Sequence, residues 1–388
     1  MIRLRQILGK QVSWEDVFLS AALNDDSKKN QFPHLLAYYP PAKVNPFQDA
    51  LYSSASDFSY STIPLLKLED LLQVDWPFGL TLHVHWLGGI LKQAKTEAHA
   101  HDLLIDFIAT IKILKKKCVR IIWTLHNVLP HQTRFEKVEI RLRKEMSVLS
   151  DGIHILTKDT SNVVSSIYKL DEKKVFYTPH PGYHSYYMPV VKRAVARTEL
   201  SWEKNAFYFL FFGGIERYKG IKKLLHDFKL LNNKYVSREL RLVIVGPPSN
   251  EAYTREISDL IEPSDTRILF LPRSIPDSEV HLYFSASNVV VMPYEGALNS
   301  GVSLLAANFE RPVVAPNEGA IAEIWGQDNN LLYDTENENS FFCAMEKSLS
   351  QKFPKVFFDR IKKRYSSEKV SVDFFSKLNS ITINNDIC

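Results

Sequence analysis

The sequence predicts an α/β protein built from two Rossmann-like domains. Short apolar runs alternate with amphipathic stretches along most of its 388 residues, which is typical of parallel sheets whose strands are joined by crossover helices. These runs form two sets, separated by a polar and aromatic segment, residues 181–199, that we interpret as a linker. The length agrees with two domains, because one hydrophobic core rarely grows beyond about 250 to 300 residues.

The first domain is expected over residues 34–180, after an N-terminal extension, residues 1–33, interpreted as a helix and a polar connection. The second domain is expected over residues 200–370, and residues 371–388 form a C-terminal segment. Buried parallel strands are continuous apolar runs. In the first domain these runs are His34–Tyr39, Leu80–Trp86, Arg120–Leu125, Gly152–Leu156 and Val175–Thr178. In the second they are a run that begins at Ala206, then Leu240–Val245, Ile268–Leu271, Val289–Met292 and Val313–Ala315.

Composition and charge narrow the classes of function. The apolar content of 45% is that of an ordinary globular protein, and a net charge of +4 is too small to indicate a nucleic-acid partner. Three cysteines without metal-ligand spacing favour a reducing compartment. The charged N-terminus predicts no secretory signal, and no apolar run reaches the roughly 18 residues of a membrane span. We therefore expect a cytoplasmic protein.

One strand end in the second half is suited to binding a phosphate. Asn288–Pro293 is a β-branched run that ends in proline, and the helix pattern after it offers Asn299 and Ser300 as N-caps. Ligands in open α/β sheets bind beyond the carboxyl ends of the strands, where a helix N-terminus presents N–H groups to an anion. Ser300, Gly301 and Val302 are therefore candidates for binding a diphosphate. An ordinary capped helix explains the pattern equally well.

A second loop in the same half strengthens this hypothesis. An aromatic strand from Phe209 runs into Gly213 and Gly214, and then into a basic turn with Arg217 and Lys219. Glycines let a ligand approach the backbone closely, and a guanidinium or an ammonium neutralises a diphosphate. A solvated helix start is the alternative interpretation of the lysine.

Three segments, in order, resemble the nucleotide-sugar half of the GT-B glycosyltransferases. They are the glycine-rich turn Gly213–Gly220, the strand end LVIVGPP at Leu242–Pro248, and the strand, loop and helix of Pro293–Ala315. The resemblance implies two Rossmann-like domains that face each other across a cleft, the first binding the acceptor and the second the nucleotide sugar. It also implies that the C-terminal segment crosses back to the first domain. A metal-independent reaction is expected, because no Asp-x-Asp motif accompanies a strand end, and we expect no other cofactor.

Within that class the chain is similar to the family 4 glycosyltransferases, with departures at the donor loop. Gly214 stands where the family has an arginine, and Ala297 and Leu305 stand where it has two glutamates. Glu295 is the nearest carboxylate before the helix and becomes a candidate for donor binding. The segments HVHWLGG and TLHNVLPH resemble a bacterial exopolysaccharide subset that includes β-1,4-mannosyltransferases. The departures leave retention or inversion at the sugar open.

The first domain is expected to supply a general base. Histidine suits this role because its unperturbed pKa, about 6.5, lies near physiological pH. His126 directly follows a predicted strand and is the first candidate, and His85 is the second. The resemblance adds that family 4 enzymes often carry a functional histidine at the matching strand end. A hydrogen-bonded structural histidine is the alternative, and it is favoured for His83 and His131.

Other side chains at the predicted sheet edges are candidates for contacts with the substrates. Glu323 is a candidate for hydrogen bonds to the donor ribose or sugar, although a helix N-terminal carboxylate explains it equally well. Arg273 and Tyr294 are candidates for flanking the nucleobase, and the alternative is a solvated loop position for each. Asp49 and Glu136 are the carboxylates that compete for the role of base.

The expected function is transfer of a hexose from a nucleotide diphosphate sugar, GDP-mannose or a UDP-sugar, to a saccharide acceptor in cell-surface polysaccharide or glycolipid synthesis. The sugar nucleotide and a lipid-linked form of the acceptor are implied by the resemblance. The alternatives are an epimerase or hydrolase of nucleotide sugars with the same fold, and a nucleotide-sugar-binding protein without catalysis. Fold does not decide among the three.

A basic cluster in the first half is a candidate for peripheral contact with the inner face of the membrane. An anionic leaflet attracts such clusters, whereas a solvated helix face is the more common explanation. The cluster consists of Lys115, Lys116, Lys117, Arg120, Lys137, Arg141, Arg143 and Lys144.

Overall fold

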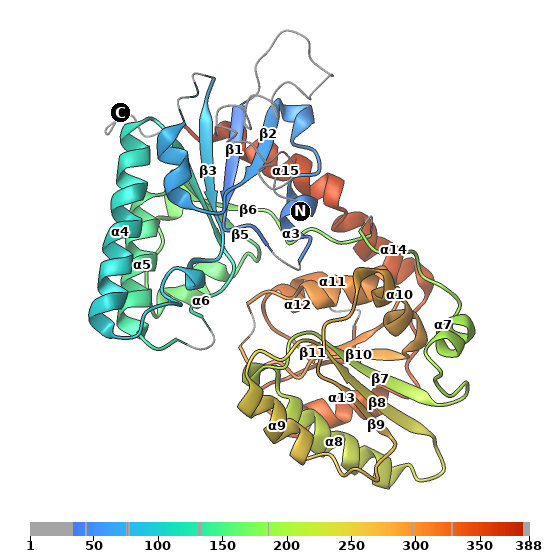
Figure 1. Cartoon of the computed structure of the whole chain (residues 1–388). Helices are drawn as coiled ribbons and strands as arrows, with labels where there is room; N and C mark the ends of the chain where they lie inside the picture. Colours follow the sequence, from blue (N-terminus) through green and yellow to red (C-terminus); the bar gives the residue numbers. More distant parts are fainter. Residues whose placement is uncertain are drawn as a thin grey trace, which may run out of the picture. The chain divides into compact units, whose positions relative to one another are not determined.

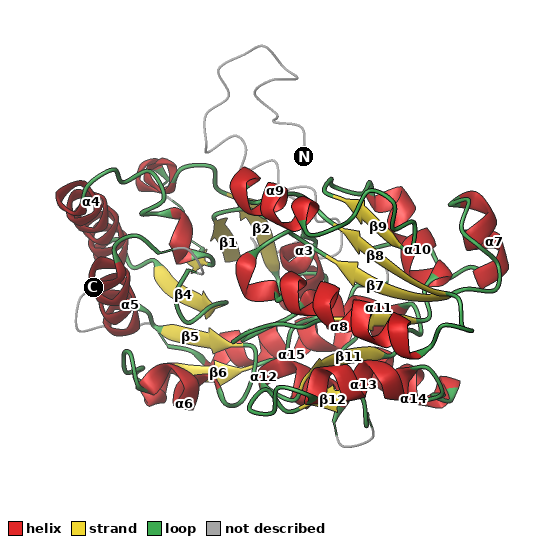
Figure 2. Ribbon diagram, turned by 90° about the horizontal axis from the view of Figure 1, so that it is seen from below, coloured by secondary structure: helices red, strands yellow, loops and turns green. Residues whose placement is uncertain are grey.

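The computed structural model describes residues 34–42, 45–74, 76, 78–130, 133–184, 186–296, 298–326 and 329–382. The N-terminal extension, His131 and Ala297 therefore lie outside the described residues. The chain divides into two units (Figures 1 and 2). Unit 1 contains the described residues up to Pro179 and those from Glu368 onward, and unit 2 is His180–Ser367. Each unit has one parallel six-stranded sheet with helices on both faces.

The sheet of unit 1 has the strand order β2-β1-β3-β4-β5-β6, and all its neighbours are parallel. The five strands that the sequence predicts are present. Four of them are mostly buried runs that fit a sheet covered on both faces, and the edge strand β6 is half-buried. The sixth, β2, was not predicted: it lies at the sheet edge and its sequence, YSTIP, mixes polar and apolar residues. The strands are β1 (His34–Tyr39), β2 (Tyr60–Pro64), β3 (Leu80–Val84), β4 (Arg120–Leu125), β5 (Gly152–Ile155) and β6 (Val175–Tyr177).

Helices cover both faces of this sheet. Figure 1 shows α4 and α5 side by side on one face and α15 on the other. The start of α4 is capped by Thr96, whose hydroxyl accepts a hydrogen bond from the His99 N–H at 3.2 Å. The α-helices are α3 (Phe47–Leu51), α4 (Glu97–Lys116), α5 (Glu136–Leu149), α6 (Thr160–Ser165) and α15 (Ser367–Ser380). Short 3-10 helices are η1 (Ser56–Phe58), η2 (Leu68–Gln73), η3 (Leu87–Gly89) and η4 (Glu172–Lys174).

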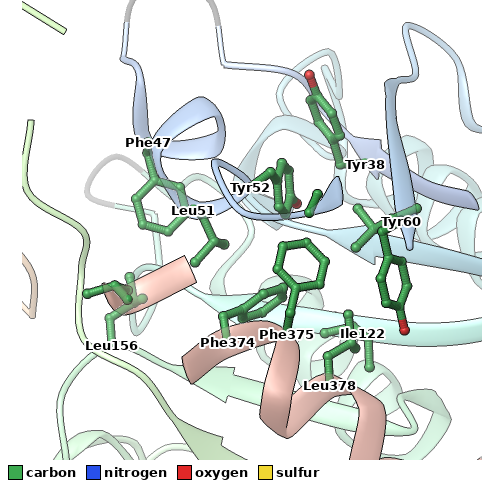
Figure 3. Close-up of a cluster of buried hydrophobic side chains, with 13 residues drawn as sticks. Tyr38, Phe47, Leu51, Tyr52, Tyr60, Ile122, Leu156, Phe374, Phe375 and Leu378 are labelled. Carbon is green, nitrogen blue, oxygen red and sulfur yellow. The ribbon is translucent and has the colours of Figure 1, made fainter. Parts of the chain in front are cut away.

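The C-terminal helix α15 is part of the core of unit 1. Figure 3 shows its residues Phe374 and Phe375 pointing toward Tyr52, with Leu378 beside Ile122. These side chains are buried in one apolar cluster, and burying each aromatic ring contributes roughly 1.5–3 kcal/mol. Helix α15 is therefore needed to complete the first hydrophobic core.

The sheet of unit 2 has the order β12-β11-β10-β7-β8-β9 and is also parallel. Its five predicted strands are present, and the sixth, β12, has only two residues and no periodic signal. The strands are β7 (Phe207–Phe212), β8 (Leu240–Val245), β9 (Ile268–Leu271), β10 (Val289–Val291), β11 (Val313–Pro316) and β12 (Leu332–Tyr333).

In unit 2, helices α8, α9 and α13 lie on one face of the sheet and α10, α11 and α12 on the other (Figure 1). The helices are α7 (Arg193–Glu199), α8 (Ile221–Lys234), α9 (Glu251–Asp259), α10 (Asp277–Ala286), α11 (Gly301–Asn308), α12 (Gly319–Trp325), α13 (Ser340–Ser348) and α14 (Lys355–Arg364), with the 3-10 turn η5 (Arg217–Lys219).

The segment expected as a linker, residues 181–199, belongs to unit 2 and contains α7. The buried guanidinium of Arg197 ties α7 to this unit. It donates to the Ala286 carbonyl at 3.0 Å and to Asn288 Oδ1 at 2.7 Å. The sequence did not predict this attachment, because the partners of Arg197 lie about ninety residues further along the chain.

Three members of the predicted basic cluster are buried, so that part of the expectation is wrong. Lys115 pairs with Asp151 at 2.6 Å, and Arg143 pairs with Glu139 at 2.6 Å. Arg120 donates to the Tyr60 hydroxyl and to carbonyls of the C-terminal segment. The other members are exposed. Among the described residues, no helix combines the length and the apolar character that crossing a membrane requires.

Candidate active site

Each sheet has one point where the strand order reverses, and ligands of open α/β folds bind there, beyond the carboxyl ends of the strands. In unit 2 the reversal falls between β7 and β10, which are neighbours in the sheet. The loops that follow these two strands begin at Gly213 and Met292, and they are the two loops that the sequence singles out. In unit 1 the reversal falls between β1 and β3.

Glycines lock the two loops of unit 2 together. Gly213 and Gly220 have φ values of +127° and +65°, a region that favours glycine. A Cβ on Gly220 would lie 1.9 Å from the Pro293 carbonyl oxygen, so the backbones pass in direct contact. The Glu295 N–H also donates to the Tyr218 carbonyl at 2.8 Å. The turn after β7 and the loop after β10 therefore form one structure.

Lys219 carries the positive charge of this structure. Its Nζ lies 3.0 Å from the position of a Cβ on Gly213, and the residue is only 8% exposed. The ammonium also lies 5.7 Å from the ring centroid of Tyr294. Burial lowers the pKa of Lys219, and the nearby Glu216 partly offsets this. Within the described part of the chain the ammonium forms no salt bridge, so an anion bound beside Gly213 would be its natural partner.

The N-terminus of α11 faces the same place. Val302 Cγ2 lies 3.8 Å from the position of a Cβ on Gly213. Ser300 is the N-cap residue, but the expected capping bond is absent: its hydroxyl contacts the Met292 sulfur at 3.7 Å. The first N–H groups of the helix are therefore not satisfied by this side chain, and they remain suited to an anion. A Cβ on Gly301 would lie 2.9 Å from the Tyr183 hydroxyl, which shows how closely this end is packed.

Arg217 does not join Lys219. Its guanidinium pairs with Glu256 of α9 at 2.9 Å and lies 4.6 Å from the centre of the Tyr253 ring. The Arg217 side chain is 64% exposed. The structure thus places one of the two predicted cations at the glycine turn and the other on the surface beside α9.

Among the remaining donor candidates, Tyr294 lies beside Lys219, whereas the others occupy exposed or helical positions. Arg273 is exposed after the edge strand β9, and Glu295 is exposed after β10. Tyr294 is buried and 6.3 Å from the Tyr218 ring, so it packs inside the loop. Glu323 lies within α12, and its carbonyl accepts from the Tyr365 hydroxyl at 3.0 Å. The residue at the N-terminus of that helix is Glu318.

In unit 1, His126 lies directly after β4 and is partly exposed. Its ring stacks on that of Trp86, with 4.4 Å between the ring centroids. It also meets the Phe47 ring edge-on, with 4.9 Å between the centroids. These contacts fix the plane of the imidazole. His126 lines a cavity of about 300 Å³ together with Gly88, Gly89 and Lys92. A Cβ on Gly89 would meet nothing within 4 Å, so this side of the cavity is open to a ligand.

His85 lies behind His126 and is only 1% exposed. A hydrogen bond of 3.0 Å joins its Nδ1 to Nε2 of His126. The Tyr52 hydroxyl lies 2.7 Å from both His85 Nε2 and His83 Nδ1. Burial lowers the pKa of His83 and of His85 well below the usual value, and the neighbouring histidines add to this effect. Both imidazoles are neutral at physiological pH.

The group continues from His83 to Thr124, His154 and Thr178. Sequence reasoning missed four of its members, namely Tyr52, Thr124, His154 and Thr178. One signal was available: in HVH the two histidines are two positions apart, which places both on one face of a strand. Their hydroxyl partners come from other elements and gave no local pattern. Among the described residues, no three His, Cys, Asp or Glu side chains are grouped as ligands for a metal ion.

Comparisons with known proteins agree with this geometry. Residues 206–351 match the family described as "Glycosyl transferases group 1". The GDP-mannose:glycolipid 4-beta-D-mannosyltransferase of Xanthomonas campestris pv. campestris is 27% identical over 319 residues, which are 79% of this chain and 80% of that relative.

Solved structures share the fold. Sucrose-phosphate synthase from Thermosynechococcus elongatus has a TM-score of 0.69 at 14% identity, covering 89% of this chain and 98% of that one. The Anabaena protein HepE, solved with UDP and glucose, has a TM-score of 0.66 at 12% identity, covering 90% and 100%. The chain is a glycosyltransferase with the GT-B fold and is similar to family 4, as the sequence predicts.

Proposed function

We propose that this glycosyltransferase moves mannose from GDP-mannose to a hydroxyl of a lipid-linked saccharide. The identity of the two substrates is supported by the mannosyltransferase that matches 79% of the chain, whose name specifies GDP-mannose and a glycolipid. The structural observation that carries the proposal is the buried Lys219 ammonium, which lies against the glycine turn at the strand-order reversal of unit 2.

Unit 2 binds the donor diphosphate. As the sugar leaves, negative charge grows on the phosphate oxygen that was bonded to it. The Lys219 ammonium, which is largely buried, and the first N–H groups of α11 are preorganised to stabilise that charge. Arg217 takes a smaller part, because its salt bridge with Glu256 holds it beside α9.

Unit 1 supplies the base. The acceptor hydroxyl gives its proton to His126 while its oxygen forms a bond to the anomeric carbon. The bond between that carbon and the phosphate oxygen breaks, and its electron pair leaves with the nucleoside diphosphate. This is an inverting displacement. It is supported by the absence from the sequence of the two glutamates that family 4 enzymes carry at the positions of Ala297 and Leu305.

The test is a thermal-shift panel with GDP, UDP, ADP, GDP-mannose and UDP-glucose. A ligand that binds only the folded state raises its stability, by about 2.7 kcal/mol at a concentration of 100 Kd. We expect GDP and GDP-mannose to raise the Tm of the native chain, and not that of Lys219→Ala. The matched control is Lys222→Ala, which removes an exposed lysine of α8 and should keep the shift.

A Tm increase with UDP and UDP-glucose alone would mean that the donor is a UDP-sugar and not GDP-mannose. No increase with any of the five would refute the donor site. A positive result leads to turnover assays with the selected donor and a lipid-linked oligosaccharide.

We also propose that the protein works at the cytoplasmic face of the membrane, where a lipid-linked acceptor would be presented. The support comes from α4 and α5, which lie side by side (Figure 1). Their exposed side chains include Lys116, Lys137, Arg141 and Lys144, and also Ile113 and Val148, which are 48% and 71% exposed. Basic and apolar side chains together suit an anionic bilayer surface.

A further inference from the structure

A continuous line of hydrogen bonds runs through the interior of unit 1 behind His126. It passes across β3, β4 and β5 and ends just after β6. Its successive donor-to-acceptor distances are 3.0, 2.7, 2.7, 2.6, 2.9 and 2.6 Å. We call it the histidine chain, and its members in order are His126, His85, Tyr52, His83, Thr124, His154 and Thr178.

The two inner hydroxyls give the histidine chain a single direction. The hydroxyl of Tyr52 lies between two imidazole nitrogens, and so does that of Thr124. A hydroxyl has one proton, so it can donate to only one of its two neighbours, although it can accept from both. A neutral imidazole has one N–H and one lone pair. Once one end of the histidine chain fixes which nitrogen receives a hydroxyl proton, the nitrogen on the other side of that hydroxyl must donate to it, and this assignment passes along the whole chain.

This argument requires the inner imidazoles to be neutral, and their burial ensures it. His83 and His154 are fully buried, and His85 is nearly so. Burial and the neighbouring histidines lower the pKa of His83 and of His85 well below 6.5. An imidazolium at His154 would bring an uncompensated charge into the same interior, which is strongly unfavourable.

The far end of the histidine chain decides its direction. His154 Nε2 lies 3.1 Å from the Thr178 carbonyl oxygen as well as 2.6 Å from its hydroxyl. A carbonyl oxygen only accepts, and a lone pair on Nε2 would repel it. Nε2 of His154 therefore carries the proton, and its Nδ1 accepts from Thr124. Followed back along the chain, the same rule makes His85 Nδ1 an acceptor, so that His126 Nε2 donates to it.

We propose that the histidine chain holds His126 in the Nε2–H tautomer, which makes Nδ1 its basic nitrogen. His85, Tyr52, His83, Thr124 and His154 are then positioning residues that act through His126. The tautomer follows from the hydrogen bonds and from the neutral state of the buried rings. The use of Nδ1 as the base for the acceptor hydroxyl rests on the proposed function.

The arrangement also prepares His126 for the reaction. When Nδ1 takes a proton, the ring becomes an imidazolium, and its Nε2–H still donates to the lone pair of His85 Nδ1. No group in the histidine chain has to turn around when this charge forms. A preorganised acceptor stabilises the developing charge more than one that must reorient.

The test compares two tyrosines of one buried cluster. Tyr52→Phe removes the hydroxyl at the centre of the histidine chain. Tyr60→Phe removes a hydroxyl that instead accepts from Arg120 at 2.6 Å and donates to Asn379 at 2.9 Å. Both residues belong to the core around α15 and are 7% and 4% exposed (Figure 3). The second variant is therefore a control for the loss of a buried hydroxyl bond.

The readout is the protonated nitrogen of each ring, from two-bond ¹H–¹⁵N correlations of the full chain labelled at histidine. His126→Ala identifies the signals. In the native chain near pH 7.5 we expect the Nε2–H form of His126. In Tyr52→Phe the direction is lost, so the Nδ1–H form should become comparably populated. The acid limb of kcat/KM should shift, and kcat should fall about 3- to 10-fold, with the donor KM unchanged.

In Tyr60→Phe the tautomer and the pH profile should stay native, even where the Tm falls. A native His126 that is mainly Nδ1–H would overturn the inference. So would identical tautomer ratios in the two phenylalanine variants. If the tautomer is as expected and His126→Ala keeps full turnover, the histidine chain stands and the assignment of the base fails.

Discussion

The carboxyl edges of the two sheets have the same architecture and opposite chemistry. In each unit the strand order reverses at one point, and the loops of the central strands meet there. In unit 1 the side chains at this edge are imidazoles and hydroxyls, which can donate or accept a proton. Unit 2 fills the same edge with glycine backbone, helix N–H groups and the Lys219 ammonium. The fold thus provides the place, and the side chains decide whether a proton or an anion is handled there.

Removing His126 should give the largest effect. Without the base, the acceptor hydroxyl keeps its proton, so His126→Ala should lower kcat about 10²- to 10⁴-fold. Nucleotide binding is proposed for unit 2, so this variant should keep the native Kd for GDP. Steady-state turnover and a GDP titration measure the two quantities.

The control is His99→Ala, at an exposed position near the start of α4. Native turnover in His126→Ala would exclude this residue as the base. If His126→Ala lost both turnover and affinity for GDP, the carboxyl edges of the two sheets would not have separate functions.

Removing Lys219 should come next. The loss of one preorganised cation at a leaving diphosphate costs about 10²- to 10³-fold in kcat. Unlike the histidine variant, Lys219→Ala should also weaken GDP binding, because the ammonium contacts the anion in the ground state. Arg217→Ala should change either quantity by less than about 10-fold, since that guanidinium is exposed and paired with Glu256. Measuring kcat and the Kd for GDP of both variants would check this prediction. Equal losses in the two variants would contradict the placement of Arg217 away from the diphosphate.

Acid should destabilise unit 1 more than unit 2. The folded pKa values of His83 and His85 lie well below 6.5, so below that pH the unfolded chain binds protons that the folded one does not. Stability is therefore complete above about pH 6.5 and falls as the pH drops. Each buried histidine costs about 2 kcal/mol at pH 5. Unit 1 also contains His34, with its pKa lowered to about 4, whereas unit 2 has His180, also about 4.

Hydrogen exchange at pH 7 and pH 5, corrected for intrinsic rates, resolves the two units. The amides of β3 and β4 should lose about 4 kcal/mol more protection than those of β7 and β8, because three of the four cited histidines lie in unit 1. His180→Gln should remove part of the loss in unit 2 and leave unit 1 unchanged. If the amides of the two units lose the same amount of protection in the native chain, the histidine chain does not govern the loss of stability in acid.

The same comparison shows which features of the fold and of the candidate site could be predicted from the sequence. The buried strand LRLVIV of β8 is apolar except for Arg241, and its bounds were predicted to the residue. Strand ends then placed His126, Gly213 and the start of α11 at sheet edges. The directions of side chains were not predictable. Arg217 pairs with Glu256 on another helix, and Tyr52 bonds to His83, which is 31 residues away. Such partners depend on tertiary packing, which leaves no local periodicity.

The smallest effect is expected on the outer face of unit 1, away from its polar interior. If α4 and α5 contact an anionic bilayer, each exposed cation contributes about 1 kcal/mol, so Arg141→Ala should weaken partition onto phosphatidylglycerol-containing vesicles about 5-fold. Cosedimentation at low and high salt measures this. Arg255→Ala, at an exposed arginine of α9, is the control in unit 2. Equal losses for the two arginines would mean that net charge, and not this face of unit 1, governs the binding.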